Sequence, residues 1–190
     1  MNKNIKIMLV IMAVIFAAPF VAALFMPQTF VVEREIVIDK PNSEVFEFVK
    51  NLKNQEKYSK WFIVDPHIKK KYTGTDGTVG FVMAWDSDNE AVGKGEQEIK
   101  KIDDGKRVDV EIRMIKPFQS TDPAYTTTES IGENQTKVKS VYSGKMNYPM
   151  NLLCGIGVDK LGHEMHVNLV NLKNTLQGSK DAPPEDIKTH

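Results

Sequence analysis

The C-terminal part of the chain carries an apolar residue at every third or fourth position between Val158 and Leu176. This spacing places the apolar side chains on one stripe, so it predicts an amphipathic α-helix over residues 158–177. Gly178 follows at a position where helices commonly end. Glycines disfavour a helix, and their presence near its start predicts that it begins late, near Val158, or is frayed there. The stripe consists of Val158, Leu161, Met165, Leu169, Leu172 and Leu176, and the glycines are Gly155, Gly157 and Gly162.

Residues 30–146 alternate instead between apolar and polar positions, with the period of a half-buried β-strand. Turn sequences such as Asp103-Asp104-Gly105 separate the alternating runs and indicate an antiparallel meander. Two short helices are expected at 44–51 and 54–61, and Asn42 or Ser43 can cap the first of them. The expected strands are 30–39, 68–73, 78–85, 91–102, 107–115, 124–131 and 136–146.

Two arginines fall inside expected strands. Arg34 shares a strand face with Ile36 and Ile38, which we expect to face the core. It is either an inward arginine that binds a carboxylate or phosphate headgroup, or a surface arginine paired with a glutamate. Arg113 lies on a strand face that is charged throughout. Ion pairing across the strands is therefore the favoured interpretation for Arg113.

The N-terminal segment combines two lysines with a long uncharged run. Lys3 and Lys6 precede residues 7–26, and about twenty apolar residues suffice to span a bilayer core as a helix. The segment is either an uncleaved signal anchor or a signal peptide cleaved near Val21-Ala22-Ala23. The length of the run favours the anchor. In both cases the lysines stay in the cytoplasm and the remainder is exported.

These patterns divide the chain into three parts. Residues 1–27 form the signal anchor or transmembrane helix, residues 28–178 a folded domain, and residues 179–190 a disordered tail with two prolines. We expect a single-pass protein of the bacterial inner membrane whose C-terminal domain lies outside the cytoplasm. Cleavage of the segment would instead give a secreted or periplasmic protein.

The charge balance and the cysteine content exclude several classes of protein. Lysine plus arginine and aspartate plus glutamate both number 25, and without Lys3 and Lys6 the balance is 23 against 25, or −2. A nucleic-acid partner is not expected, because phosphate binding requires a basic surface. Cys154 is the only cysteine, which rules out an intramolecular disulfide framework and a cysteine-rich zinc site.

Motifs of catalysis and cofactor binding are absent from the sequence. It contains no nucleophile elbow, P-loop or dinucleotide fingerprint. His163 and His166 lie three residues apart rather than four and lack a third ligand nearby, so a solvated helix surface is favoured over a metal site. We therefore predict no catalytic residue, no metal and no cofactor. An acid or base role would require a buried carboxylate with a raised pKa.

Several strings occur in the order found in one superfamily. They are VEREIVIDKPNSEVFEFVKNL, YSKWF, the DP at 65–66, YTGTDGTVGFVMAW at 72–85, GKGEQEI at 93–99 and NLVNLKNTL at 168–176. Over roughly residues 24–177 the chain resembles the START-like superfamily, also called SRPBCC or polyketide cyclase/dehydrase, particularly its subgroup with an N-terminal membrane segment. The resemblance implies an α+β helix-grip fold, in which a curved seven-stranded antiparallel sheet wraps the long C-terminal helix around a cavity for a hydrophobic ligand. It implies no single activity, since the superfamily includes lipid carriers, receptors, cyclases and oxygenase subunits.

The expected cavity supplies the candidate ligand contacts. Ordinary core packing is the alternative for the large side chains, and a strand bulge is the alternative for the glycines. The candidates are Trp61, Phe81, Met83, Trp85, Gly93, Gly95, Met114, Tyr142, Leu161, Met165 and Arg34. We expect a membrane-anchored domain that binds a hydrophobic or lipid-like small molecule. A cyclase- or hydrolase-type enzyme acting on a hydrophobic substrate and a ligand-free interaction protein of the envelope are the alternatives.

Overall fold

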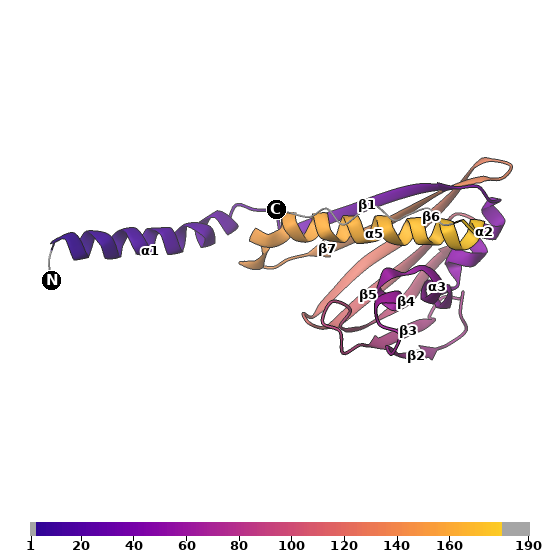
Figure 1. The fold of residues 1–190 in the computed structure, drawn as a ribbon, viewed down its shortest axis with the longest axis horizontal. Helices are drawn as coiled ribbons and strands as arrows, with labels where there is room; N and C mark the ends of the chain where they lie inside the picture. The colour runs from indigo at the N-terminus through magenta and orange to yellow at the C-terminus, as the bar shows by residue number, and fades with distance from the viewer. Residues whose placement is uncertain (1–2, 180–190) are drawn as a thin grey trace.

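The computed structural model describes residues 3–179: an extended apolar helix, followed by a sheet that wraps a second long helix (Figure 1). The helices are α1 (Lys3–Ala23), α2 (Asn42–Lys50), α3 (Gln55–Tyr58), α4 (Lys60–Val64) and α5 (Cys154–Gln177), with 3₁₀ turns η1 (Leu52–Asn54) and η2 (Met150–Leu153). The strands are β1 (Thr29–Ile38), β2 (Lys69–Thr73), β3 (Val82–Asp86), β4 (Lys94–Asp103), β5 (Arg107–Lys116), β6 (Ser120–Gly132) and β7 (Gln135–Lys145).

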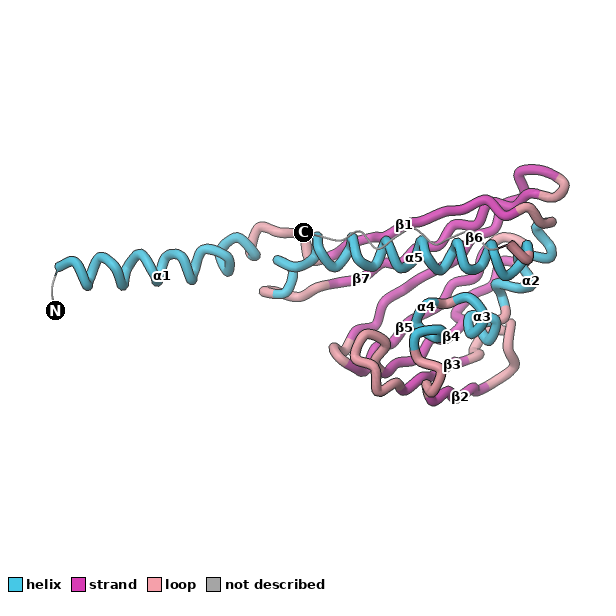
Figure 2. The backbone as a smooth tube through the Cα atoms, viewed as in Figure 1, coloured by secondary structure: helices cyan, strands magenta, loops and turns pink. Residues whose placement is uncertain are grey.

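The seven strands form one antiparallel sheet in the order β1-β7-β6-β5-β4-β3-β2. Strands β2 to β7 follow one another as a meander, whereas β1 pairs with β7, the last strand in the chain. The segment containing α2, α3 and α4 therefore carries the chain from one edge of the sheet to the other (Figure 2). The sheet curves around α5, and the predicted helix-grip fold is confirmed.

Alternation of apolar and polar residues determines which face of each strand is covered. In β1, Val32 and Ile38 are buried, whereas Val31 and Val37 are exposed. The inward direction predicted for the face that carries Ile36 and Ile38 is confirmed. The covered face of the sheet is therefore the concave face, on which α5 lies.

Two groups of buried side chains make up the core. One group joins α2 and α5 to β1 and β7, and the other joins α2 and η1 to β3, β4 and β5. The first contains Ile38, Val45, Val49, Val138, Leu169 and Leu172, and the second contains Phe46, Leu52, Phe81, Met83, Ile99 and Val108. The concave face of the sheet is thus covered by packed side chains in two places, and the region between these two groups is the place where a hollow can remain.

Several element boundaries differ from those predicted. Helix α5 begins at Cys154 rather than near Val158, because η2 leads directly into it and its first glycines are tolerated. It ends at Gln177, where Gly178 adopts a left-handed conformation, as predicted. Strand β4 begins at Lys94 rather than residue 91, because Gly93 has a φ of 66° and a preceding turn holds its amide.

The starts of α2 and β3 also differ from the prediction. The position before α2 is Pro41, and neither Asn42 nor Ser43 caps the helix through its side chain. The Asn42 side chain instead donates to the Gly105 carbonyl at 2.7 Å, which ties α2 to the β4–β5 turn. Strand β3 begins at Val82 rather than residue 78, because Gly80 adopts a φ of 86°.

Helix α1 extends away from the sheet (Figure 1). It has 21 residues, of which only Ala23 is buried, and the mean hydropathy reaches 2.5 over an 18-residue window, so its length and composition suffice to cross a membrane. Apart from Ser179, the tail expected over 179–190 lies outside the described residues.

Candidate functional site

A cavity of about 440 Å³ lies between the concave face of the sheet, helix α5 and the short helices α3 and α4. Its volume falls within the range of small-molecule sites, roughly 300–1,000 Å³. The wall contains aliphatic, aromatic and neutral polar side chains. They belong to Phe30, Val49, Leu52, Gln55, Tyr58, Ser59, Trp61, Phe62, Trp85, Ala91, Val92, Gln97, Val108, Val110, Ile112, Met114, Ala124, Tyr125, Thr126, Ser140, Val141, Tyr142, Met146, Gly157, Leu161, Met165, Asn168, Leu169 and Leu172.

Small residues on the concave face and on α5 leave space between the sheet and the helix. Ala124 pairs with Tyr142 and with Val110, and Ser140 pairs with Thr126, so two small side chains lie in the centre of the concave face. On α5, Gly157 presents no side chain to this space. Leu169 and Leu172 of α5 belong to the first core group, whereas the second group contains no α5 residue, and the hollow lies between the two groups.

Glycines at the edge of the cavity support the wall rather than line it. A Cβ at Gly95 would lie 2.7 Å from Trp85 Cζ2 and 2.8 Å from the Arg113 carbonyl, so only glycine leaves room for the indole. Trp85 also meets Phe62 of α4 edge to face, with 6.4 Å between the ring centroids. A Cβ at Gly93 would collide with the Lys116 carbonyl. The register of β4 against β5 shifts between Lys94 and Gly95, so this stretch contains the bulge named as the alternative for the glycines.

The structure separates the candidate residues into two sets. Those that line the cavity are Trp61, Trp85, Met114, Tyr142, Leu161 and Met165. Phe81 and Met83 do not line it, because both are fully buried in the core group that contains Phe46 and Leu52. Gly93, Gly95 and Arg34 also lie outside the wall. Phe81 and Met83, which α2 and η1 cover, therefore belong to the core.

Arg34 occupies a space that Gly162 leaves on α5. A Cβ at Gly162 would collide with the Arg34 guanidinium, and Arg34 Nη1 donates to the Glu33 carbonyl at 2.7 Å. Neither of the alternatives predicted for Arg34 describes this packing, in which its charge lies against the helix and outside the cavity wall. Gly162 thus has a packing role, because it admits the arginine between β1 and α5.

Neutral polar groups are distributed around the apolar wall. Gln97 on β4 is buried and donates through Nε2 to Gln55 Oε1 at 2.8 Å. Ser59 is 2% exposed, and its hydroxyl makes no hydrogen bond within residues 3–179. A buried hydroxyl without a partner is costly, by about 1–3 kcal/mol, unless a bound group supplies one. Ser59 is therefore the wall residue best suited to bind a polar atom of a ligand.

Tyr142 places a hydroxyl between the cavity and a buried carboxylate. Its Oη donates to Asp122 Oδ2 at 2.7 Å, and Asp122 is 5% exposed. Burial, together with this hydrogen bond, raises the pKa of Tyr142 above its ordinary value. The phenol consequently stays protonated at neutral pH and separates the carboxylate from the apolar space.

Polar contacts hold the segment 55–64, which we call the cover segment, against α5, and an ion pair between Lys60 and Glu164 at 3.8 Å is one of them. The Tyr58 carbonyl accepts from Asn171 Nδ2 at 3.0 Å, and the Lys60 amide donates to Asn168 Oδ1 at 2.7 Å. Trp61 Nε1 donates to Glu164 Oε2 at 2.8 Å. The cover segment lies beside α5 and closes one side of the cavity (Figure 2). The contacts between α5 and the cover segment were not predicted from the sequence, although Glu164, Asn168 and Asn171 are spaced four and three apart and share one helix face.

Removing one of these contacts should loosen the cover segment alone. Asn171→Ala and Asn168→Ala are each expected to cost about 1 kcal/mol, which increases local opening about fivefold. Hydrogen exchange measured by mass spectrometry should then be faster over residues 58–64 and unchanged in β6 and β7. Asp159→Ala, at an exposed position of the same helix, is the matched control. Faster exchange throughout the domain would contradict a local role.

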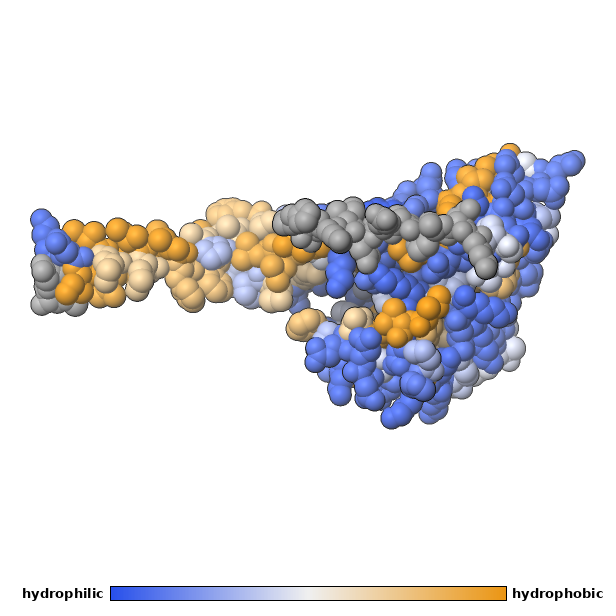
Figure 3. All heavy atoms as spheres, in the orientation of Figure 1, coloured by the Kyte–Doolittle hydropathy of each residue, from blue (hydrophilic) through white to orange (hydrophobic). Residues whose placement is uncertain are grey.

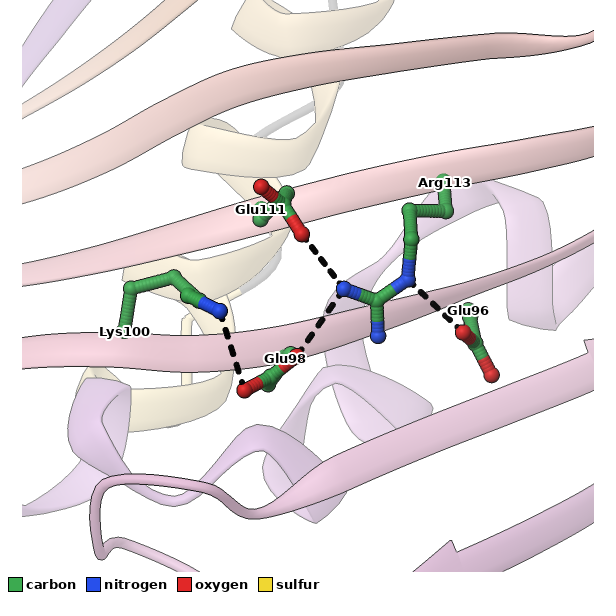
Figure 4. A network of polar contacts seen from close by, with 5 residues as sticks. All are labelled: Glu96, Glu98, Lys100, Glu111 and Arg113. Carbon is green, nitrogen blue, oxygen red and sulfur yellow. Dashed lines mark hydrogen bonds and ion pairs between the residues drawn. The ribbon is translucent and has the colours of Figure 1, made fainter.

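The opposite face of the sheet carries an ion-pair network (Figure 4). Arg113 bonds to Glu96 at 2.7 Å, Glu98 at 2.9 Å and Glu111 at 2.5 Å, and Lys100 bonds to Glu98 at 3.1 Å. Hydrogen bonds to Glu96 and Glu98 raise the pKa of Arg113, and Arg113 and Lys100 lower the pKa of Glu98. The favoured interpretation of Arg113 as a cross-strand ion-pairing residue is confirmed, and its charge lies outside the cavity wall.

The described residues contain no group of three histidine, cysteine, aspartate or glutamate side chains suited to hold a metal ion. His163 and His166 both belong to α5 and lie outside the cavity wall. Cys154 is buried at the start of the same helix.

A curved antiparallel sheet around a long C-terminal helix, with a largely apolar hollow between them, defines a helix-grip domain. Neither a protein-family model nor a curated protein matches the chain. Solved structures share the fold at low sequence identity.

Three of these structures illustrate the similarity. Norcoclaurine synthase from Thalictrum flavum, in complex with dopamine and hydroxybenzaldehyde, matches with a TM-score of 0.61 at 10% identity, over 81% of this chain and 90% of that one. A protein from Thermus thermophilus matches with a TM-score of 0.58 at 16% identity, over 80% and 100%. The Aha1 dimer from Colwellia psychrerythraea matches with a TM-score of 0.57 at 15% identity, over 80% and 99%.

Proposed function

We propose that this protein binds a neutral, predominantly apolar small molecule in the cavity between the sheet and α5. The observation that carries the proposal is the wall of the 440 Å³ cavity, which contains no aspartate, glutamate, lysine, arginine or histidine among the described residues. Burial of apolar surface contributes about 25 cal/mol per Å², so an apolar molecule gains from such a wall. A charged ligand would lose its hydration without gaining an ion pair there.

The polar groups of the wall narrow the class of ligand further. Ser59 offers a buried hydroxyl that has no partner within residues 3–179, and Asn168 lies on the facing helix. A ligand with one hydroxyl or carbonyl group on an otherwise apolar body would satisfy Ser59 and fill the hollow. A free fatty acid fits less well, because its carboxylate would lack a cation in the wall.

We also infer that α1 anchors the domain to a membrane. Its 21 residues correspond to a length of about 30 Å, which matches the thickness of a bilayer core. Lys3 and Lys6 at its beginning favour a cytoplasmic N-terminus, with the sheet domain on the outer side of a bacterial inner membrane. This arrangement supports a role in holding a lipid-like molecule at the envelope.

The chain's two tryptophans, Trp61 and Trp85, both line the cavity and so allow a direct test. Full-length protein in phosphatidylcholine nanodiscs is titrated with N-phenylnaphthylamine, a neutral apolar fluorophore that accepts energy from tryptophan. Binding in the cavity is expected to quench tryptophan emission saturably with one probe per chain, whereas partition into lipid quenches without saturation. Quenching without any saturable part would contradict the proposal.

An enzyme is the second candidate, and the Tyr142–Asp122 pair is the observation that favours it. The phenol oxygen faces the cavity and can accept a hydrogen bond from a substrate, while the buried Asp122 carboxylate holds it in position. Native mass spectrometry of the full chain identifies the molecule that copurifies with it. If that molecule is recovered with altered mass after incubation with the protein, the enzyme is favoured; if it is unchanged, binding alone is favoured.

A further inference from the structure

One end of the sheet domain combines the attachment of α1 with an exposed apolar surface. Because the sheet is antiparallel, the start of β1, the end of β7 and the turn between β5 and β6 lie at the same end. Helix α5 also starts there, and α1 projects from this end (Figure 1). We call it the anchor-proximal end.

Large apolar side chains are exposed over the whole of this end. Phe25 is 85% exposed, and Phe118 and Ile156 are each 73% exposed, although they lie between 38 and 131 positions apart in the chain. In Figure 3 the apolar surface of α1 continues onto the adjoining end of the domain. The exposed residues are Leu24, Phe25, Met26, Ile115, Phe118, Tyr148, Met150, Leu153 and Ile156.

A buried asparagine fixes this surface relative to α1. Asn151 of η2 is fully buried, and its Nδ2 donates to the Ala23 carbonyl at 2.7 Å and to the Met26 carbonyl at 3.1 Å. The Met146 amide donates to the Gln28 carbonyl at 2.8 Å, so the linker between α1 and β1, residues 24–28, is tied to the end of β7 as well. The linker therefore holds η2 and the start of α5 at the point where α1 ends.

The cavity reaches towards the same end. Gly157 in the first turn of α5 lines it and follows directly after the exposed Ile156. Met146 lines it just beyond β7, and Met114 lines it four residues before the exposed Phe118. The exposed apolar residues thus flank wall residues from two sides, α5 and the β5–β6 turn.

We propose that the anchor-proximal end sits in the surface of the lipid bilayer and that the cavity takes up its ligand from the bilayer through this end. The inference rests on the proposed function, which supplies both the apolar ligand and the spanning role of α1. Residues 24–26 directly follow α1, so a spanning α1 places them at the membrane surface. The bonds from Asn151 bring η2 to the same level, where Tyr148 suits the boundary between lipid and water.

A lipid surface explains this distribution better than a protein partner does. The exposed residues surround the end of a helix that itself has the composition of a membrane span. A protein partner at this position would also have to lie in the plane of the bilayer. An apolar ligand that enters from lipid avoids transfer through water, which costs roughly 0.8 kcal/mol for each CH₂ group.

Depth measurements on the full-length chain in phosphatidylcholine vesicles test the inference. Single cysteines for a spin label are introduced as Phe118→Cys, Ile156→Cys, Val79→Cys and Ile131→Cys in a Cys154→Ser background. Val79 and Ile131 are exposed apolar positions near the opposite end of the sheet and serve as matched controls. Labels at 118 and 156 are expected to collide mostly with oxygen, which concentrates in lipid. Labels at 79 and 131 should collide mostly with a water-soluble nickel chelate.

Each possible pattern of lipid and water exposure at the four labels either supports the inference or contradicts it. Water exposure at 118 or at 156 would overturn the inference, because the two sides of the cavity must both meet the bilayer. Lipid exposure at 79 or 131 would also overturn it, since the domain would then lie on its side. The tryptophan quenching assay is run on the same variants. Saturable probe binding with a water-exposed anchor-proximal end would remove the inference alone, and immersion of that end in lipid without saturable binding would remove the proposed function alone.

Discussion

Replacing Phe81 with alanine is expected to lower the free energy of unfolding by about 3–5 kcal/mol. Phe81 is fully buried, and its ring lies parallel to that of Tyr72 with 6.3 Å between the centroids. It packs with Phe46 and Leu52, which belong to different elements, so no single neighbour can move to fill the space. Urea unfolding of the full-length chain, followed by tryptophan emission, measures the loss.

The same variant separates a core residue from a ligand contact. Because Phe81 does not line the cavity, Phe81→Ala is expected to keep saturable quenching by N-phenylnaphthylamine below its unfolding transition. Val79→Ala, two residues away and exposed, should change stability by less than about 0.5 kcal/mol. If Phe81→Ala abolished probe binding while stability stayed near that of the parent protein, the assignment of Phe81 to the core would be wrong.

Phe81 also shows which features of the cavity wall can be predicted from the sequence and which cannot. Phe81, Met83 and Trp85 alternate along one strand face, and their period identifies the strand and its inward side. It does not reveal that α2 and η1 cover the first two, while Trp85 meets Phe62 of the cover segment. Residues that are equivalent in pattern thus become core in one place and cavity wall in another, according to what packs on them from a distant part of the chain.

The start of α5 was mispredicted for a similar reason. Each glycine inside a helix costs up to about 1 kcal/mol relative to alanine, and this cost was the basis for a late start. Packing outweighs it here: Gly162 admits Arg34, and Gly157 adjoins both Met146 and the cavity. The Asn151 bonds to the end of α1 were also not predicted, since they join residues 125 or more positions apart without a local signal.

Local periodicity was sufficient to predict the strands and the long C-terminal helix. Six of the strands follow one another through short turns, and the stripe from Leu161 to Leu172 faces the sheet as predicted. The pairing of β1 with β7 was not predicted, because no turn connects these strands. The hollow itself depends on Ala124, Ser140 and Gly157 of α5 lining the same space, which is a tertiary relation.

Filling that hollow should abolish binding without unfolding the domain. Ala124 lies in the centre of the concave face between Val110 and Tyr142, and its side chain points into the cavity. In Ala124→Phe the added ring would occupy ligand space, so the affinity for N-phenylnaphthylamine should fall at least tenfold, or about 1.4 kcal/mol. Because the ring enters an existing hollow, the destabilisation of about 1–3 kcal/mol typical of overpacking is not expected.

Thr127→Phe is the matched control for this substitution, since it introduces the same ring on the same strand at a position outside the cavity wall. It is expected to leave the saturable quenching intact. Native mass spectrometry of the full-length chain provides a second readout that does not depend on the probe. A lipid bound to α1 would remain in both variants, because neither changes that helix, whereas a molecule held in the cavity should be lost only from Ala124→Phe. Retention of the same copurifying mass and the same probe affinity in Ala124→Phe would place the ligand elsewhere and remove the central proposal.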